Sequence, residues 1–298
     1  MFAVITITFT LGFYGPGDPL RMYYGEQVNQ IDEETLNRLR EHYGLNDSYI
    51  EQYGNYLSGL VQGDLGQSIL MNRPVGEAML RALPVSIQLG MAAMFVVMVL
   101  GIPLGVISAL RQNSWMDHTI LTSTIFLSTI PPFVLGPLLM ILFILKLDVL
   151  PSTFGWEGVF SVKSILPIIV LAVGPLVLVI RYTRLGVIDA LSQDYVRTAR
   201  AKGLGTAAII RRHVLPNALT PVVTALSFSV AGLITGSIFV EAIFGIPGFG
   251  GQVVRALTGS DYPMLLGTTM VGAIIVIIVN LIADITYAIL DPRVRLDG

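Results

Sequence analysis

Four stretches of the chain contain no Asp, Glu, Lys or Arg, and each is long enough to cross a lipid bilayer. They are residues 82–110, 118–145, 213–240 and 262–283. A helix needs about 20 mainly apolar residues to span the hydrocarbon core. A fifth run, residues 164–180, reaches that length if it continues past Arg181. Only 13% of the residues are charged, against about 25% in soluble domains. We therefore expect an all-α, multi-pass membrane protein.

The chain opens with a shorter apolar segment, residues 1–14 ("MFAVITITFTLGFY"). No Lys or Arg precedes it and it has no small-residue cleavage site, so it lacks the pattern of a signal peptide. We expect residues 1–14 to be a partial first transmembrane helix, truncated at its N-terminus; a short interfacial segment is the alternative. Five complete spans bring the expected total to six. We expect them over residues 84–110, 118–146, 164–186, 218–243 and 264–289.

Residues 15–83 differ from the expected spans because they are mostly polar. The cluster "GPGDP" ends the first helix, and two helical patterns follow it. In the first pattern, Asp32 has the position of a helix cap and Gly44 the position of a helix end. The second pattern is "DSYIEQYGNYLSGLVQG". We expect an extracytoplasmic helical region over residues 15–83 and a transmembrane domain over residues 84–298.

Positive charges are concentrated in alternate loops. One side of the expected membrane domain carries Arg111, the cluster from Arg181 to Arg212, Arg293 and Arg295. The short loops of the other side carry Lys146, Lys163 and Arg255. Cytoplasmic loops carry an excess of Lys and Arg, so the first side and the C-terminus are expected to be cytoplasmic.

The most basic of these segments, residues 187–217, is named here the basic loop. Helix-forming residues run up to a break at Gly203–Leu204–Gly205, and "TAAIIRRHVLPNA" then predicts a second short helix. A compact helix–Gly–helix unit with many hydrogen-bond donors is suited to bind in a groove of a cytoplasmic partner. The alternative is that the arginines only fix the topology and contact anionic lipid headgroups.

The spacing within the basic loop resembles a motif of ABC importer permeases. In that motif Glu-Ala-Ala precedes a Gly and then Ile-x-Leu-Pro, and here the chain has Arg197-Thr198-Ala199, Gly203 and His213-Val214-Leu215-Pro216. The departures at the Glu, the first Ala and the Ile match the variant "RTARAKG", which is similar to the dipeptide/oligopeptide/nickel subfamily. Further stretches resemble the same subfamily in order and spacing over almost the whole chain: "PGDP", "GDLGQS", "GIPLG", "VEAIFGIPGFG", "DYP" and "LDPRVR".

This resemblance implies a type I ABC importer permease fold with six transmembrane helices. It also implies the first of two permease subunits of an importer of di- or oligopeptides, in a bacterial or archaeal cytoplasmic membrane. The implied partners are a second, homologous permease subunit in a heterodimer, two ABC ATPase subunits, an extracytoplasmic substrate-binding protein and the lipid bilayer, with no nucleic acid. Import of nickel or another small solute is an alternative within the family. A proton-coupled secondary transporter is the alternative from a different class.

The resemblance assigns ATPase coupling to the basic loop. The residues concerned are Arg197, Thr198, Ala199, Arg200, Lys202, Gly203, Leu204, Leu215 and Pro216. Small residues would permit close packing, the cationic side chains would make polar contacts, and Leu215–Pro216 would fix the entry into the next span. The chain has no Gly-x-x-x-x-Gly-Lys-Ser/Thr phosphate loop. We therefore expect no enzyme activity and no cofactor in this chain, with ATP and Mg bound by the partner subunits.

Glu241 and Asp284 are the acids expected near membrane depth, where carboxylates can act as ion or proton sites. We consider Glu241, Pro131 and Pro132 candidates for the pathway or a gate. A structural role for Glu241 and ordinary packing kinks at the two prolines are the alternatives. No Cys is present, and the three His are scattered along the chain without metal-ligand spacing. The sequence therefore predicts no metal site.

Overall fold

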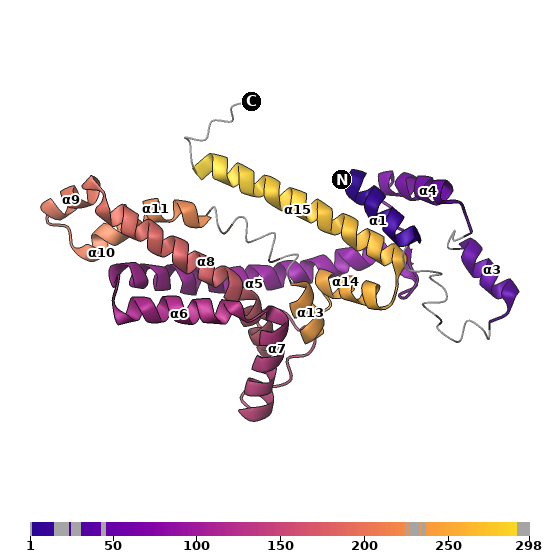
Figure 1. Ribbon diagram of the computed structural model, residues 1–298, viewed down its shortest axis with the longest axis horizontal. Helices are drawn as coiled ribbons and strands as arrows, with labels where there is room; N and C mark the ends of the chain where they lie inside the picture. The colour runs from indigo at the N-terminus through magenta and orange to yellow at the C-terminus, as the bar shows by residue number, and fades with distance from the viewer. Residues whose placement is uncertain are drawn as a thin grey trace. The chain divides into compact units, whose positions relative to one another are not determined.

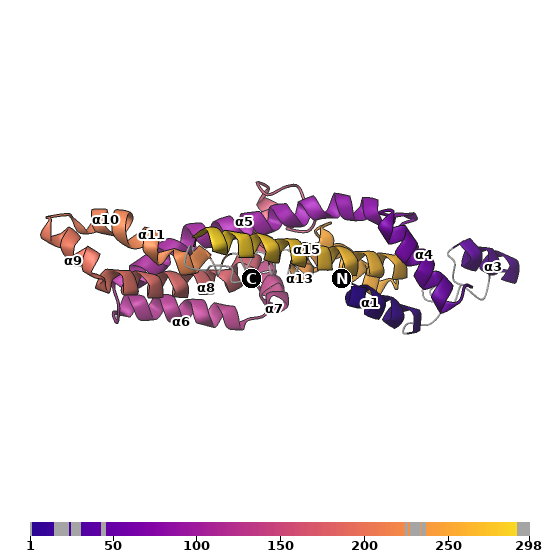
Figure 2. The ribbon, with the colours of Figure 1, turned by 90° about the horizontal axis from the view of Figure 1, so that it is seen from above.

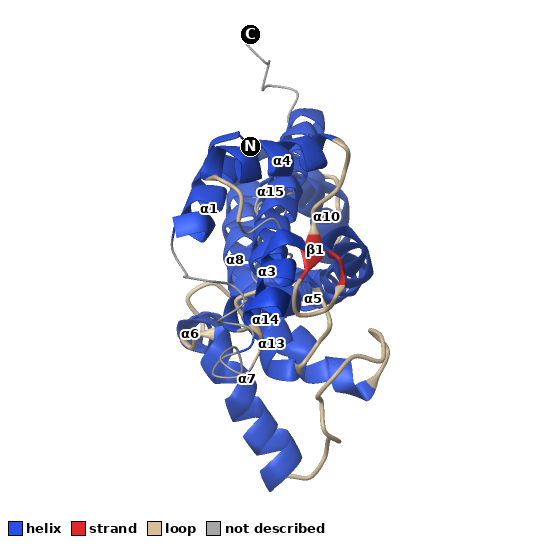
Figure 3. Cartoon of the chain, turned by 90° about the vertical axis from the view of Figure 1, so that its right-hand side faces the viewer, coloured by secondary structure: helices blue, strands red, loops and turns tan. Residues whose placement is uncertain are grey.

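The computed structural model describes residues 2–14, 24, 31–42, 46–223, 226, 233 and 237–290. The described residues are mostly helical, with one short β-hairpin (Figures 1 and 3). The chain divides into two compact units. The first comprises residues 1–86 and 247–276, and the second comprises residues 87–246 and 277–298. Two long helices, α5 (Val75–Leu110) and α15 (Tyr262–Leu290), begin in the first unit and end in the second.

The first unit contains small helices around the starts of α5 and α15. Its other elements are α1 (Phe2–Tyr14), α3 (Glu33–His42), α4 (Tyr49–Val61), the antiparallel pair β1 (Gln67–Ser68) and β2 (Arg73–Pro74), and α14 (Phe249–Thr258). A buried apolar cluster joins α5, α14 and α15 through residues such as Met79, Phe249 and Met264. The two polar helices expected within residues 15–83 are therefore present as α3 and α4.

Local hydrogen bonds fix where α3 and α4 begin. The Asp32 carboxylate accepts a hydrogen bond from the Thr35 N–H at 2.9 Å, which confirms the expected cap. Gly44, the expected helix end, lies outside the described residues. Ser48 and Glu51 form a reciprocal capping box at the start of α4. The hydrogen bonds from Ser48 hold the pKa of the Glu51 carboxyl below its ordinary value.

Aromatic side chains pack α1 against α4. Phe9 is 3% exposed and lies against the rings of Tyr49 and Tyr53. The hydroxyls of Thr6 and Thr10 pair with the hydroxyls of Tyr53 and Tyr49, each at 2.7 Å. The apolar face of α1 is thereby matched to a tyrosine-rich face of α4, so the helix holds its place by ring packing and hydroxyl pairs.

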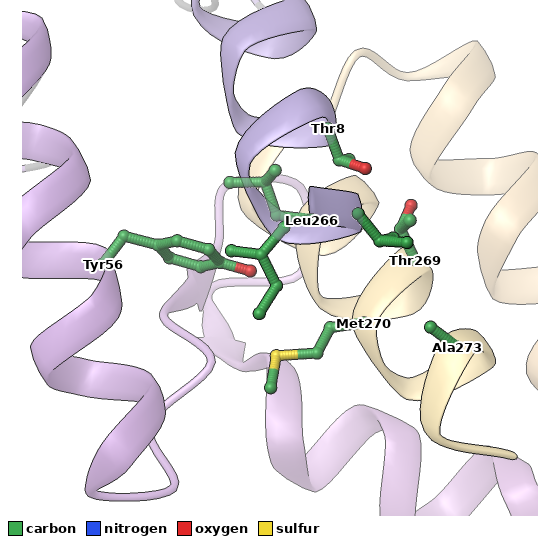
Figure 4. A pocket seen from close by; sticks show the side chains of 8 residues that line it. Thr8, Tyr56, Leu266, Thr269, Met270 and Ala273 are labelled. Atoms are coloured by element: carbon green, nitrogen blue, oxygen red, sulfur yellow. The ribbon is translucent and has the colours of Figure 1, made fainter. Parts of the chain in front are cut away.

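A small recess lies between α1, α4 and α15 (Figure 4). Tyr56 of α4 points into it toward Leu266 and Met270 of α15, and Thr8 of α1 lies above them. Burial raises the pKa of the Tyr56 hydroxyl to about 12. The lining is mostly apolar, so we regard the recess as a packing gap of this unit.

The second unit is built on α5, α6 (Trp115–Thr129) and α8 (Ile165–Ser192), which run alongside one another (Figures 1 and 2). Its remaining helices are short. They are α7 (Pro132–Met140), the π-helical η2 (Ile141–Lys146), the 3-10 turn η3 (Val162–Ser164), α9 (Asp194–Ala201), α10 (Thr206–Ile209), the π-helical η4 (Ile210–Val214), α11 (Leu215–Ala218) and α13 (Ile238–Phe244).

The motif "GIPLG" brings α5 close to α8. A methyl group at Gly101 would lie 2.8 Å from Val179 Cγ1, and one at Gly105 would lie 2.6 Å from Thr183 Cβ and 2.8 Å from the Ile180 carbonyl oxygen. Small residues at i and i+4 let transmembrane helices approach closely. The two glycines therefore form the seam along which α5 meets α8.

Among the described residues, three helical segments are long and apolar enough to cross a membrane: Val75–Leu110, Val162–Ser192 and Tyr262–Ile282. They agree with the spans expected over 84–110, 164–186 and 264–289. If each bent helix pair is counted as one span, the described residues contain up to five. The span expected over 218–243 falls largely outside the described residues, apart from its ends.

The span expected over 118–146 is broken in the middle. Its two halves, Trp115–Thr129 and Pro132–Lys146, are bent by 99°. Pro131 lacks a backbone N–H, and its ring restricts the preceding residue, so Ile130 leaves the helical conformation with ψ of 116°. Pro131 then caps α7, and Pro132 takes its first position.

Replacement of Gly105 by Ala is expected to lower the midpoint of thermal unfolding, because the added methyl group forces α5 away from α8. Overpacking of a closely packed site costs about 1–3 kcal/mol. Gly174→Ala is the matched control, since a methyl group there meets nothing within 4 Å. The measurement is thermal unfolding of both variants in detergent. Equal midpoints would contradict the close seam.

Candidate functional site

The basic loop begins with the last residues of α8, 187–192, and then folds into a compact structure (Figure 1). Gln193 is extended between α8 and α9, with ψ of 151°, so the chain turns sharply there. Within α9, Val196 and Ala199 share one face and are 0% and 4% exposed. Arg197, Thr198 and Arg200 lie exposed on the other faces. The short helix therefore has one side buried within the chain and one side offered outward.

The buried side of α9 belongs to a core that the basic loop shares with α5 and α8. Its members come from six helices: Ala109, Val187, Ala190, Val196, Ala199, Ile209, Val214 and Ala218. Burial of apolar surface is favourable at about 25 cal/mol per Å². The basic loop is consequently packed on the helix ends as part of the same folded unit.

Gly203 ends α9 in a Schellman motif. Its φ is +79°, which glycine adopts without strain. The Leu204 N–H donates to the Ala199 carbonyl at 3.2 Å, and the Gly203 N–H donates to the Arg200 carbonyl at 2.9 Å. The Leu204 side chain packs against the core of the basic loop. Space beside Gly203 is open within the described chain, so the backbone conformation, not a close approach, requires glycine here.

The second half of the basic loop returns along α8. Leu215 and Pro216 open α11, where Pro is tolerated because the first helical N–H groups have no intrahelical partner. A methyl group at Gly186 of α8 would lie 2.5 Å from the Ala218 carbonyl oxygen, so α11 touches the backbone of α8. Sequence reasoning did not single out Gly186. Gly186 is an isolated glycine within a helical pattern. Such a glycine often has a packing reason, and this was the sequence signal that could have identified it.

The outward surface of the basic loop is cationic. Arg197, Arg200, Lys202, Arg211 and Arg212 are all exposed. Arg197 pairs with Asp194 at 3.3 Å, but both side chains are exposed, so the pair contributes little. Donors on a rigid helix are available to an acidic or carbonyl-rich partner surface at little entropic cost.

The candidate gate residues lie on two helices that pack together. Pro131 and Pro132 start α7, and Glu241 lies on α13, which contacts α7. Glu241 is fully buried, and its Oε1 accepts a hydrogen bond from the Ser237 hydroxyl at 2.6 Å. The Asp284 side chain lies outside the described residues. The pathway or gate role of Glu241, Pro131 and Pro132 stays a prediction.

Two of the quoted motifs meet in the first unit. The Asp261 carboxylate of "DYP" is buried and accepts hydrogen bonds from the Ser68 hydroxyl of "GDLGQS" and from the N–H groups of Ile69, Leu70 and Met264. The same carboxylate thus caps the start of α15 and also holds the turn between β1 and β2. Both motifs are recognisable in the sequence, but the contact between them was not predicted. Among the described residues, no group of three His, Cys, Asp or Glu is placed to hold a metal ion.

Comparison with known proteins identifies the class. Residues 101–296 match the family described as "Binding-protein-dependent transport system inner membrane component", and residues 1–90 match its N-terminal family. The chain is 38% identical over 98% of its length to the dipeptide transport system permease protein of Bacillus subtilis (strain 168), covering 93% of that protein. It is 37% identical over 99% of its length to the oligopeptide transport system permease protein of Escherichia coli (strain K12), covering 95% of it.

Solved structures show the same fold. A chain of the MetNI methionine ABC transporter in an inward-facing conformation is 17% identical and has a TM-score of 0.60, over 72% of this chain and 96% of that one. A chain of an amino acid ABC transporter is 15% identical, with a TM-score of 0.52, over 71% of this chain and 93% of that one.

The apolar helices and these matches define an integral inner membrane permease with the type I ABC importer fold. The chain belongs to the family of binding-protein-dependent transport system inner membrane components, and within it to the dipeptide/oligopeptide permeases. It is a transport subunit, not an enzyme. The family description makes it one component of a larger transport system.

Cysteine labelling tests the two faces of α9, because the chain has no native Cys. Arg200→Cys is expected to react with a polar maleimide at least about ten times faster than Val196→Cys, since thiol reactivity depends on exposure. The measurement is the labelling rate of the permease expressed without its partner subunits and solubilised in mild detergent, so that nothing covers the outward face of α9. Equal rates would contradict the buried position of Val196.

Proposed function

We propose that the chain is a permease subunit of an ATP-driven importer of di- or oligopeptides, supplied by an extracytoplasmic binding protein. The relatives named as dipeptide and oligopeptide permeases, matched over nearly their whole length, support the substrate class. A second, homologous permease subunit completes the translocation pathway, and two ABC ATPase subunits bind ATP and Mg. The basic loop and the C-terminus face the cytoplasm of a bacterial or archaeal cell.

The outward face of α9 is the proposed contact with an ATPase subunit. The observation that carries this assignment is the division of α9 into a buried apolar side and an exposed cationic side. Arg197, Thr198, Arg200 and Lys202 would donate to the ATPase. A rigid helix transmits a displacement of the ATPase subunit to the helices it packs on, whereas a flexible loop would deform instead.

The remaining residues of the motif support the shape of that contact. Ala199 lies in the core of the basic loop, Gly203 provides the left-handed turn, and Leu204 packs beneath it. Leu215 and Pro216 begin α11, which returns the chain to α8. When the two ATPase subunits close, the ends of α5 and α8 would therefore move as one body. Alternating access requires rigid-body motion of this kind.

Charge reversal on α9 tests the ATPase contact. Arg200→Glu, alone and with Lys202→Glu, is expected to reduce the amount of ATPase that co-purifies with the complex by about tenfold or more, because a like-charge contact in an interface costs several kcal/mol. Arg38→Glu, an exposed arginine of α3, is the matched control. Undiminished co-purification of the ATPase with the double variant would rule out this face as the docking site.

Energy coupling separates the proposal from the secondary-transporter alternative. In proteoliposomes that hold the complete transporter, uptake of a labelled dipeptide is expected to require ATP hydrolysis and to persist when a protonophore collapses the proton gradient. Labelled nickel, offered in the same assay, is expected not to accumulate. Uptake that stops with the protonophore while ATP remains would support a proton-coupled mechanism instead, and nickel uptake without dipeptide uptake would correct the substrate.

A further inference from the structure

A buried ion pair lies directly beneath the basic loop and joins α6 to α8. Asp117 is in the first turn of α6 and is 1% exposed; Arg184 is in α8 and is 16% exposed. Arg184 Nε donates to Asp117 Oδ1 and Arg184 Nη2 donates to Asp117 Oδ2, each at 2.8 Å. This bidentate geometry fixes the guanidinium plane as well as its distance.

Further donors to the same carboxylate come from α5 and from the turn that follows it. The Ser108 hydroxyl of α5 donates to Asp117 Oδ1, and the Asn113 N–H donates to Oδ2 at 2.9 Å. A buried ion pair offsets its desolvation only with good geometry and additional hydrogen bonds, and both are present. Asp117 therefore holds α5, α6 and α8 at one point.

The ion pair is adjacent to the core of the basic loop. Ser108 precedes Ala109, and Arg184 lies one helical turn before Val187; both Ala109 and Val187 belong to that core. The glycine seam already holds α5 to α8. The ion pair adds α6, which packs along α8.

From this point α6 leads to the rest of the second unit. It ends at the break before Pro131, and α7 begins there and packs against α13. A displacement of the basic loop would pass into α8 through the shared core. It would pass into α6 through Arg184 and Asp117.

We propose that Asp117 and Arg184 are positioning residues that make α5, α6 and α8 move with the basic loop as one body, so that ATPase closure reaches α6. This inference rests on the proposed function, because it presupposes that an ATPase binds the basic loop. Apolar contacts are enough to keep the helices in contact, but they leave the mutual orientation of the helices less well defined. Directional hydrogen bonds also fix their mutual orientation, which a transmitted movement requires.

The test uses the complete transporter, with its binding protein, in proteoliposomes. Asp117→Asn removes the negative charge at nearly constant volume, and Arg184→Lys keeps the positive charge without the bidentate contact. Glu157→Gln is the matched control, since it breaks an exposed pair with Lys163. Three quantities are measured: ATPase subunit bound per permease, rate of ATP hydrolysis, and dipeptide transported per ATP hydrolysed.

We expect Asp117→Asn to retain the ATPase and to hydrolyse ATP, while dipeptide transported per ATP falls by about tenfold, within the range of coupling between distant sites. Arg184→Lys is expected to be intermediate and Glu157→Gln to match the wild type. Unchanged transport per ATP in Asp117→Asn would overturn the proposal. Loss of ATPase binding in both Asp117→Asn and Arg184→Lys would also overturn it, because the pair would then only shape the docking surface.

Ser108→Ala keeps both charges and decides the matter if Asp117→Asn does not assemble. A partial loss of transport per ATP with normal ATPase binding is expected, and wild-type coupling in both Ser108→Ala and Arg184→Lys would overturn the proposal. The proposed function fails separately, if the wild type shows no ATP-driven uptake or if charge reversal on α9 leaves ATPase binding intact.

Discussion

The packing of the basic loop onto the ends of α5 and α8 is the interaction on which the functional account depends. Val196 and Ala199 bury one side of α9 in a core shared with Ala109 and Val187. Without that core, the cationic residues would lie on a flexible segment. With it, they lie on a surface whose movement is the movement of the membrane helices themselves.

Close backbone contacts and directional hydrogen bonds then link the helices around this core. Gly105 brings α5 to α8, and Gly186 brings α11 to α8. The Asp117 carboxylate adds α6 through Arg184. In a membrane the lipid is as apolar as the helix surfaces, so small residues and polar contacts supply much of the specificity of helix packing. The second unit uses both.

Much of this arrangement could be predicted from the sequence. The features that could not be predicted share one physical cause. Runs without charge predicted the spans now seen in α5, α8 and α15, and the pattern around Gly203 predicted two helices separated by a glycine. The sequence predicted one span over residues 118–146 with ordinary packing kinks, but the helices before and after Pro131 are bent by 99°. Arg184 and Asp117 are 67 positions apart, and Ser68 and Asp261 are 193 apart. Helical periodicity reports only neighbours within a few turns, so contacts between helices were not visible in it.

Site-specific cross-linking in native membranes tests the central claim most directly. The chain has no native Cys, so a photoreactive group can be attached to a single Arg200→Cys in the assembled transporter, with a single cysteine at Arg38 as the control position. The account predicts a cross-linked product between the Arg200 position and an ABC ATPase subunit, and none from the Arg38 position. A product formed only with lipid at the Arg200 position would show that this face binds the membrane surface, and would contradict the account.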